Sequence, residues 1–241
     1  MSRPFLFFLL LPFVFISCQE EREPFDPGYT TLAIKALANA DSARIDRVTP
    51  SGFFASAMKV RTEITVMNCR ALHRAETDPA ILASAIAHLV YSNYQYSEAD
   101  SAQDMEVLFT DTLGNKSDFT FPVSKITAVD ELITLSRTYY GELSNEKTAH
   151  LSREFDPSLV PQSGNELFGE IGKMAQDSGA GALMLLGYKI VPMQTRLGKI
   201  DAIAISTQAM FGSRNFLLNW YYDGKSGKYR LVKLEMKRKE E

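Results

Sequence analysis

The spacing of hydrophobic and polar residues changes along this chain of 241 residues. In the first two thirds, apolar residues mostly recur every three or four positions, which is typical of amphipathic helices. From Ser178-Gly179 onward the apolar residues alternate with polar ones, which predicts strands with one buried face. We therefore predict an α+β fold, with helices packed on a curved, mainly antiparallel sheet.

The predicted helices differ in how they begin. Thr77-Asp78-Pro79 precedes apolar residues at helical spacing, and proline favours the first helical turn. Residues 163–166 and 127–130 follow the capping-box pattern, although Asp130 replaces the preferred Glu in the second. Helices are also predicted for residues 31–45 and for residues 53–72, where β-branched side chains crowd the middle of the segment.

The predicted strands comprise one hairpin and one C-terminal meander. The hairpin joins residues 105–109 to residues 118–123 through a loop that contains Gly114-Asn115. The meander has four strands, at residues 182–190, 203–211, 216–222 and 231–236. The first of them is a continuous apolar run, which predicts a strand covered on both faces.

This order of elements (N-terminal helices, a hairpin, helices, and a four-strand meander) is similar to the nuclear-transport-factor-2-like and cystatin-like superfamily. The similarity is clearest from Phe155 to Lys237. It implies a pocket between the sheet and the helices, on a fold that hosts enzymes, ligand binders and association modules alike. The additional helix at residues 163–177 departs from the simplest pattern and suggests an internal boundary within residues 144–161.

The start of the chain resembles the signal peptide of a bacterial lipoprotein. Arg3 precedes an apolar run from Phe5 to Ile16, and the small residue Ser17 stands directly before Cys18. The run is shorter than the ~20 residues that a membrane-spanning helix needs, so it fits a signal-peptide core. The resemblance implies that residues 1–17 are removed and that the thiol of Cys18 is acylated, with palmitate among its lipids. The alternative is an uncleaved or conventionally cleaved signal with a chance cysteine.

Residues 18–28 are then predicted to be an acidic, lipidated tether, and residues 29–241 the globular body. Charged, proline-containing segments rarely pack, and about ten extended residues at roughly 3.3 Å each reach some 30 Å. Because Gln19 follows the cysteine where an aspartate would signal inner-membrane retention, we expect the bacterial outer membrane, with the body facing the periplasm or the cell surface.

The composition excludes some classes of partner and of stabilisation. The formal net charge is −3, whereas nucleic-acid-binding domains usually show a basic face. The only other cysteine is Cys69, so an acylated Cys18 leaves no disulfide. Its apolar neighbours predict that Cys69 is a buried, inert residue.

No catalytic, metal or cofactor motif occurs in the chain. The histidines are His73, His88 and His150, and none belongs to a recognised nucleophile or metal-ligand pattern. His88 is predicted to be an ordinary helical histidine. The superfamily resemblance leaves open an acid–base pocket with tyrosine donors, for which the candidates are Tyr139, Tyr140, Tyr188, Tyr221 and Tyr222.

We therefore expect a membrane-anchored, non-enzymatic envelope lipoprotein that binds an unknown protein or a small apolar ligand. One alternative is a pocket acid–base enzyme on a nuclear-transport-factor-2-like fold. Another is a structural module that associates through an exposed sheet face, using outward-facing aromatic side chains from Trp220-Tyr221-Tyr222.

Overall fold

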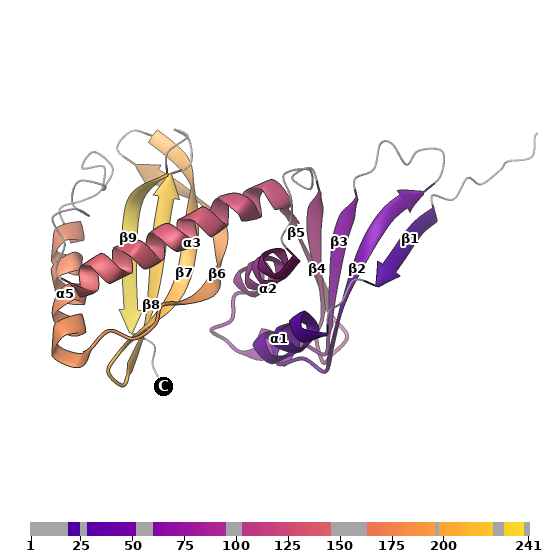
Figure 1. Cartoon of the computed structure of the whole chain (residues 1–241), viewed down its shortest axis with the longest axis horizontal. Helices are drawn as coiled ribbons and strands as arrows, with labels where there is room; N and C mark the ends of the chain where they lie inside the picture. Colours follow the sequence, from indigo (N-terminus) through magenta and orange to yellow (C-terminus); the bar gives the residue numbers. More distant parts are fainter. Residues whose placement is uncertain are drawn as a thin grey trace, which may run out of the picture.

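The computed structural model describes residues 19–24, 28–51, 60–94, 103–145, 163–195, 198–223 and 229–238. Within them the chain has the predicted α+β class, but its strands form two sheets, each with its own helices and hydrophobic core (Figure 1). The signal segment, Cys18 and His150 lie outside the described residues.

The first sheet has the order β1-β2-β3-β4-β5. Its strands are β1 (Gln19–Pro24), β2 (Ser42–Ser51), β3 (Arg61–Met67), β4 (Asp104–Thr110) and β5 (Lys116–Pro122). All pairs are antiparallel except β3 and β4. Between these two parallel strands the chain passes through a short 3-10 helix (Arg70–His73) and α2 (Pro79–Tyr94). Together with α1 (Tyr29–Ala38), α2 buries the apolar face of this sheet.

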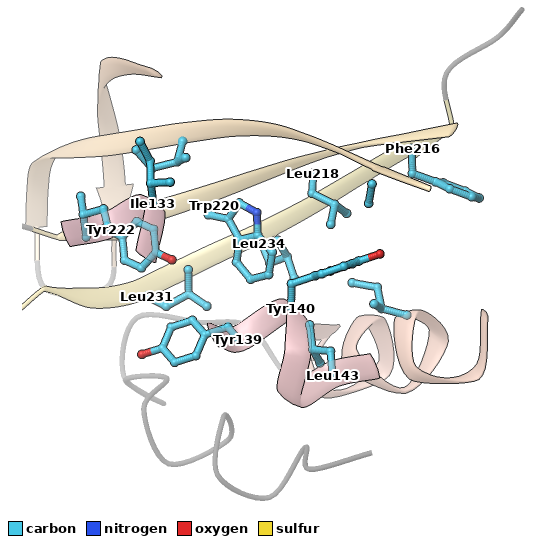
Figure 2. Close-up of a cluster of buried hydrophobic side chains, with 14 of the residues drawn as sticks. Ile133, Tyr139, Tyr140, Leu143, Phe216, Leu218, Trp220, Tyr222, Leu231 and Leu234 are labelled. Carbon is cyan, nitrogen blue, oxygen red and sulfur yellow. The ribbon is translucent and has the colours of Figure 1, made fainter. Parts of the chain in front are cut away.

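The second sheet is the predicted meander, with the order β6-β7-β8-β9. Its strands are β6 (Met184–Thr195), β7 (Gly198–Phe211), β8 (Arg214–Asp223) and β9 (Arg230–Arg238). Its inner face packs against α3 (Val123–Ser144) and α5 (Ser163–Ser178). Figure 2 shows Trp220 and Tyr222 in this core, where both are fully buried.

Helix α3 belongs to both halves of the molecule. Val123 and Ile126 in its first turn pack in the core of the first sheet, whereas Val129 and later residues pack in the core of the second. In Figure 1 the helix accordingly runs from the edge of the first sheet across the second. The two cores therefore divide within this helix, ahead of the boundary expected at residues 144–161.

Four local predictions were wrong. Residues 61–67 form β3 and not a helix, because Thr62, Ile64 and Val66 have branched side chains that pack well in a pleated sheet. The helix expected at residues 31–45 ends at Ala38, where Asn39 adopts a left-handed conformation (φ 47°).

Helix α3 begins at Val123 and not near Thr127, because the hairpin strand leads directly into it at Pro122. The segment Gln19–Pro24, expected as a solvated spacer, is the edge strand β1 and pairs with β2 from Gln19 to Pro24.

Candidate ligand cleft

A cleft of about 430 Å³ lies where the first half of the molecule meets the outer face of the second sheet. Its volume is within the range of about 300–1,000 Å³ that is usual for small-molecule sites. One wall comes from the start of α2 and the loop before it, with Arg74, Asp78 and Ile81. The floor comes from the outer face of strands β6 to β9.

Strand register explains why this face is hollow. On β7 the outward positions Ala204 and Ser206 are small, and on β8 they lie opposite Tyr221 and Asn219. Glu235 of β9 lies opposite Asn219 in turn. The centre of the floor is therefore a polar row of Ser206, Asn219 and Glu235, which crosses three strands.

Hydrogen bonds fix the polar row. The Ser206 hydroxyl donates to Asn219 Oδ1 at 2.8 Å, and the Tyr221 hydroxyl donates to Glu235 Oε2 at 2.7 Å. The ammonium group of Lys233 forms an ion pair with Glu235 Oε1 and lies 5.4 Å from the centre of the Tyr221 ring. Five side chains from three strands are thus held in two bonded groups, Ser206 with Asn219 and Glu235 with Tyr221 and Lys233.

These contacts decide how Glu235 and Tyr221 ionise. Partial burial raises the pKa of the Glu235 carboxyl, but hydrogen bonds from Lys233 and Tyr221 outweigh it, so its pKa lies below the ordinary value. Burial, with a further contribution from Glu235, raises the pKa of the Tyr221 hydroxyl. Efficient general acids and bases have a pKa near the working pH, and both shifts move away from neutrality. This tyrosine–carboxylate pair therefore gives the acid–base alternative little support.

On the opposite wall, Asp78 caps α2. Its Oδ1 accepts hydrogen bonds from the backbone N–H groups of Ala80 (2.9 Å) and Ile81 (3.4 Å), and its Oδ2 accepts one from Lys189 Nζ of β6 (3.1 Å). Partial burial raises the pKa of Asp78, yet the Lys189 and backbone hydrogen bonds together lower it below the ordinary value. The start of α2 is thus neutralised by Asp78, which is itself paired with Lys189.

Helix α2 and strand β6 approach each other closely beside the cleft. Gly187 has a φ of 144°, and a Cβ atom there would lie 2.1 Å from the Ile81 carbonyl oxygen and 2.7 Å from Ser84 Oγ. Next to it, the Tyr188 backbone N–H donates to Ser84 Oγ at 2.7 Å. We call this contact of Ile81 and Ser84 with Gly187 and Tyr188 the α2–β6 seam; it requires glycine.

Comparison with known proteins adds nothing to this geometry. No protein-family model, curated protein or solved structure matches the chain. The site must therefore be interpreted from its own side chains.

The residues singled out in the sequence lie mostly elsewhere. Cys69 is fully buried, as predicted, and its thiol donates to the Ala38 carbonyl oxygen at 3.3 Å; burial raises the pKa of this thiol. His88 is a helical histidine whose Nε2 lies 3.1 Å from Asp130 Oδ1. His73 Nε2 lies 2.7 Å from Thr112 Oγ1.

The candidate tyrosines face different ways. Tyr139, Tyr140, Tyr188 and Tyr222 are buried in the second core, and only Tyr221 lines the cleft. In the part of the chain that the structure describes, no group of three or more His, Cys, Asp or Glu side chains could hold a metal ion. No helix among these residues is long and apolar enough to cross a membrane.

Sequence reasoning did not find the cleft. The available signal was the run of small residues Ala202, Ala204 and Ser206 at alternate positions of β7, which leaves a shallow depression on one face of a sheet. This signal has meaning only once α2 is known to stand beside that face.

Proposed function

We propose that this protein is a lipid-anchored envelope protein whose body binds a small ligand in the cleft. The observation that carries the binding function is the polar row Ser206, Asn219 and Glu235, which forms the floor of a cleft between two structural elements. Binding sites are typically concave and combine apolar walls with a few placed polar groups. The interpretation as a non-enzymatic binder is favoured because fixed partners lower the pKa of the Asp78 and Glu235 carboxyls.

The anchor follows from the sequence, where Ser17 precedes Cys18 at the end of an apolar run. Gln19, the next residue, already pairs with Ser51 at the edge of the first sheet. An acylated Cys18 would therefore hold the first sheet close to the membrane surface, and not at the end of a 30 Å tether. Stable attachment requires two or more acyl chains, since one gives only marginal binding.

The anchor is tested by Cys18→Ala. We expect this variant to incorporate no labelled palmitate and to leave the membrane fraction, while the wild type incorporates the label and stays in the membrane fraction. Incorporation of label into the variant at the wild-type level would exclude the proposed lipidation.

The binding function is tested by a thermal-shift screen of small molecules on the wild type and two variants. Asn219→Ala removes a side chain of the polar row. Asn215→Ala is the matched control, because Asn215 lies on the same face of the same strand and accepts a hydrogen bond from Gln208 (3.2 Å), but does not line the cleft. Ligands of the cleft should lose their effect on Tm in Asn219→Ala and retain it in Asn215→Ala. Equal responses of both variants to every stabilising compound would exclude the cleft as the binding site.

A further inference from the structure

The charges inside the cleft occur in pairs. Asp78 is paired with Lys189, and Glu235 with Lys233. At the mouth, exposed side chains of both signs are present, with Arg74 and Glu76 from the loop before α2 and Lys237 from β9. A ligand that placed a net charge on the floor would lack a counter-charge of its own, and burying an unpaired charge is costly. The interior of the cleft is therefore suited to an uncharged group.

The polar row offers a hydrogen-bond donor, the side-chain amide of Asn219, beside an acceptor, the carboxylate of Glu235. Asn219 Oδ1 already accepts from Ser206, whereas the Asn219 Nδ2 hydrogens have no acceptor among the described residues. The neighbouring Glu235 carboxylate is acceptor only, with lone pairs beyond those used by Tyr221 and Lys233. An extended peptide residue matches this pair, because its own C=O and N–H point the same way, so that its carbonyl accepts from Asn219 while its N–H donates to Glu235. A purely apolar ligand would cover the Asn219 amide hydrogens without giving them an acceptor.

The apolar part of the lining is aliphatic. Leu37, Ile81, Leu82, Leu186 and Leu217 surround the polar row. Among the residues that the structure describes, the only aromatic ring in the lining is that of Tyr221, and Lys233 already lies 5.4 Å from its centre. Flat rings and sugars, which bind by stacking on aromatic faces, find no platform here, whereas branched aliphatic side chains find a matching surface.

From these three features we infer that the cleft binds an uncharged, extended peptide segment with aliphatic side chains, one residue of which turns its backbone N–H and C=O toward Glu235 and Asn219. This inference rests on the proposed binding function and assigns the ligand class to the same site.

The test uses the full chain, purified in detergent and labelled with ¹⁵N, and three probes followed by NMR. The probes are a leucine-rich tripeptide blocked with acetyl and amide groups, octanoate, and glucose. The blocked peptide should shift the side-chain N–H signals of Asn219 and the backbone signals of Ala204 and Ser206 in a saturable manner. Its Kd should rise at least tenfold in Asn219→Ala and change less than twofold in Asn215→Ala.

The probes separate two kinds of failure. If octanoate or glucose saturates the cleft signals and the blocked peptide does not, the ligand class is wrong while the binding function remains. If the thermal-shift screen finds cleft ligands but none of them is an amide, the ligand class is again wrong. If no compound in either experiment acts at the cleft, the proposed function fails as well.

Discussion

Replacing Gly187 by alanine should break the α2–β6 seam. The added Cβ would lie 2.1 Å from the Ile81 carbonyl oxygen, whereas heavy atoms in good contact are about 3.5–4.0 Å apart. Helix α2 would have to move away by more than about 1 Å, and the hydrogen bond from the Tyr188 N–H to Ser84 Oγ would be lost with it. A left-handed φ at a non-glycine residue adds strain of its own.

The magnitude follows from these two effects. A backbone conformation of this kind costs ~1–3 kcal/mol, and a buried N–H left without a partner costs ~1–3 kcal/mol. We therefore expect Gly187→Ala to lower the free energy of unfolding by about 2–6 kcal/mol, a large part of the ~5–15 kcal/mol typical of a folded domain. Urea denaturation monitored by Trp220 fluorescence measures this change.

Gly169→Ala provides the control. Gly169 lies inside α5 with no atom within 4 Å of an added Cβ, so alanine should stabilise the protein by ~0.5–1 kcal/mol through helix propensity. If Gly187→Ala lowers the free energy of unfolding by less than 1 kcal/mol, the argument that close approach at this glycine joins the two halves of the molecule is refuted.

Three further substitutions test other parts of the structure. Thr207→Val removes the acceptor of the buried Trp220 Nε1–H (3.0 Å) and should cost ~1–3 kcal/mol in urea denaturation. Burial lowers the pKa of His88 more than Asp130 raises it, so the folded state binds this proton less readily than the unfolded state. The stability due to neutral His88 is present above the unfolded pKa of about 6.5 and is lost as pH falls toward the folded pKa. His88→Gln should therefore make the free energy of unfolding depend less on pH between these two pKa values. Lys189→Gln should cost less than ~1 kcal/mol at low salt, and less still at high salt, because both partners of its pair with Asp78 are more than a third exposed.

Much of the second half of the molecule was predictable from the sequence. Alternation such as that of Phe216, Leu218, Trp220 and Tyr222 arises when an antiparallel sheet buries one face, and β8 shows the predicted pattern. The start of α2 was predictable for a local reason, since Asp78 caps the helix with its own side chain.

For the apolar run at residues 182–190, the predicted strand is confirmed, but the prediction that it is covered on both faces holds for only part of it. The structure begins β6 at Met184, and this strand lies at the edge of its sheet. Gly187 and Tyr188 are buried beneath α2, but Ile190 is 53% exposed. An apolar run alone does not distinguish a central strand from an edge strand that a helix covers at one point.

The first sheet was less predictable because its pairing is not local. Strand β3 pairs in parallel with β4, and α2 lies between them in the chain. Three acidic residues lie opposite one another across β2, β3 and β4, namely Asp46, Glu63 and Glu106. Acidic residues do not predict strands, although Asp46 and Glu63 are buried here. The cleft was unpredictable for the same reason, since its walls meet only through the packing of α2 on β6.

The central claim is that the cleft over Ser206, Asn219 and Glu235 is the ligand site. A crystallographic screen with several hundred small fragments tests it most directly, because bound fragments locate binding sites without assuming a ligand. We predict that amide-containing fragments concentrate in the cleft and accept a hydrogen bond from the Asn219 side chain. A cleft that holds only water, while fragments concentrate on another surface, would contradict the account.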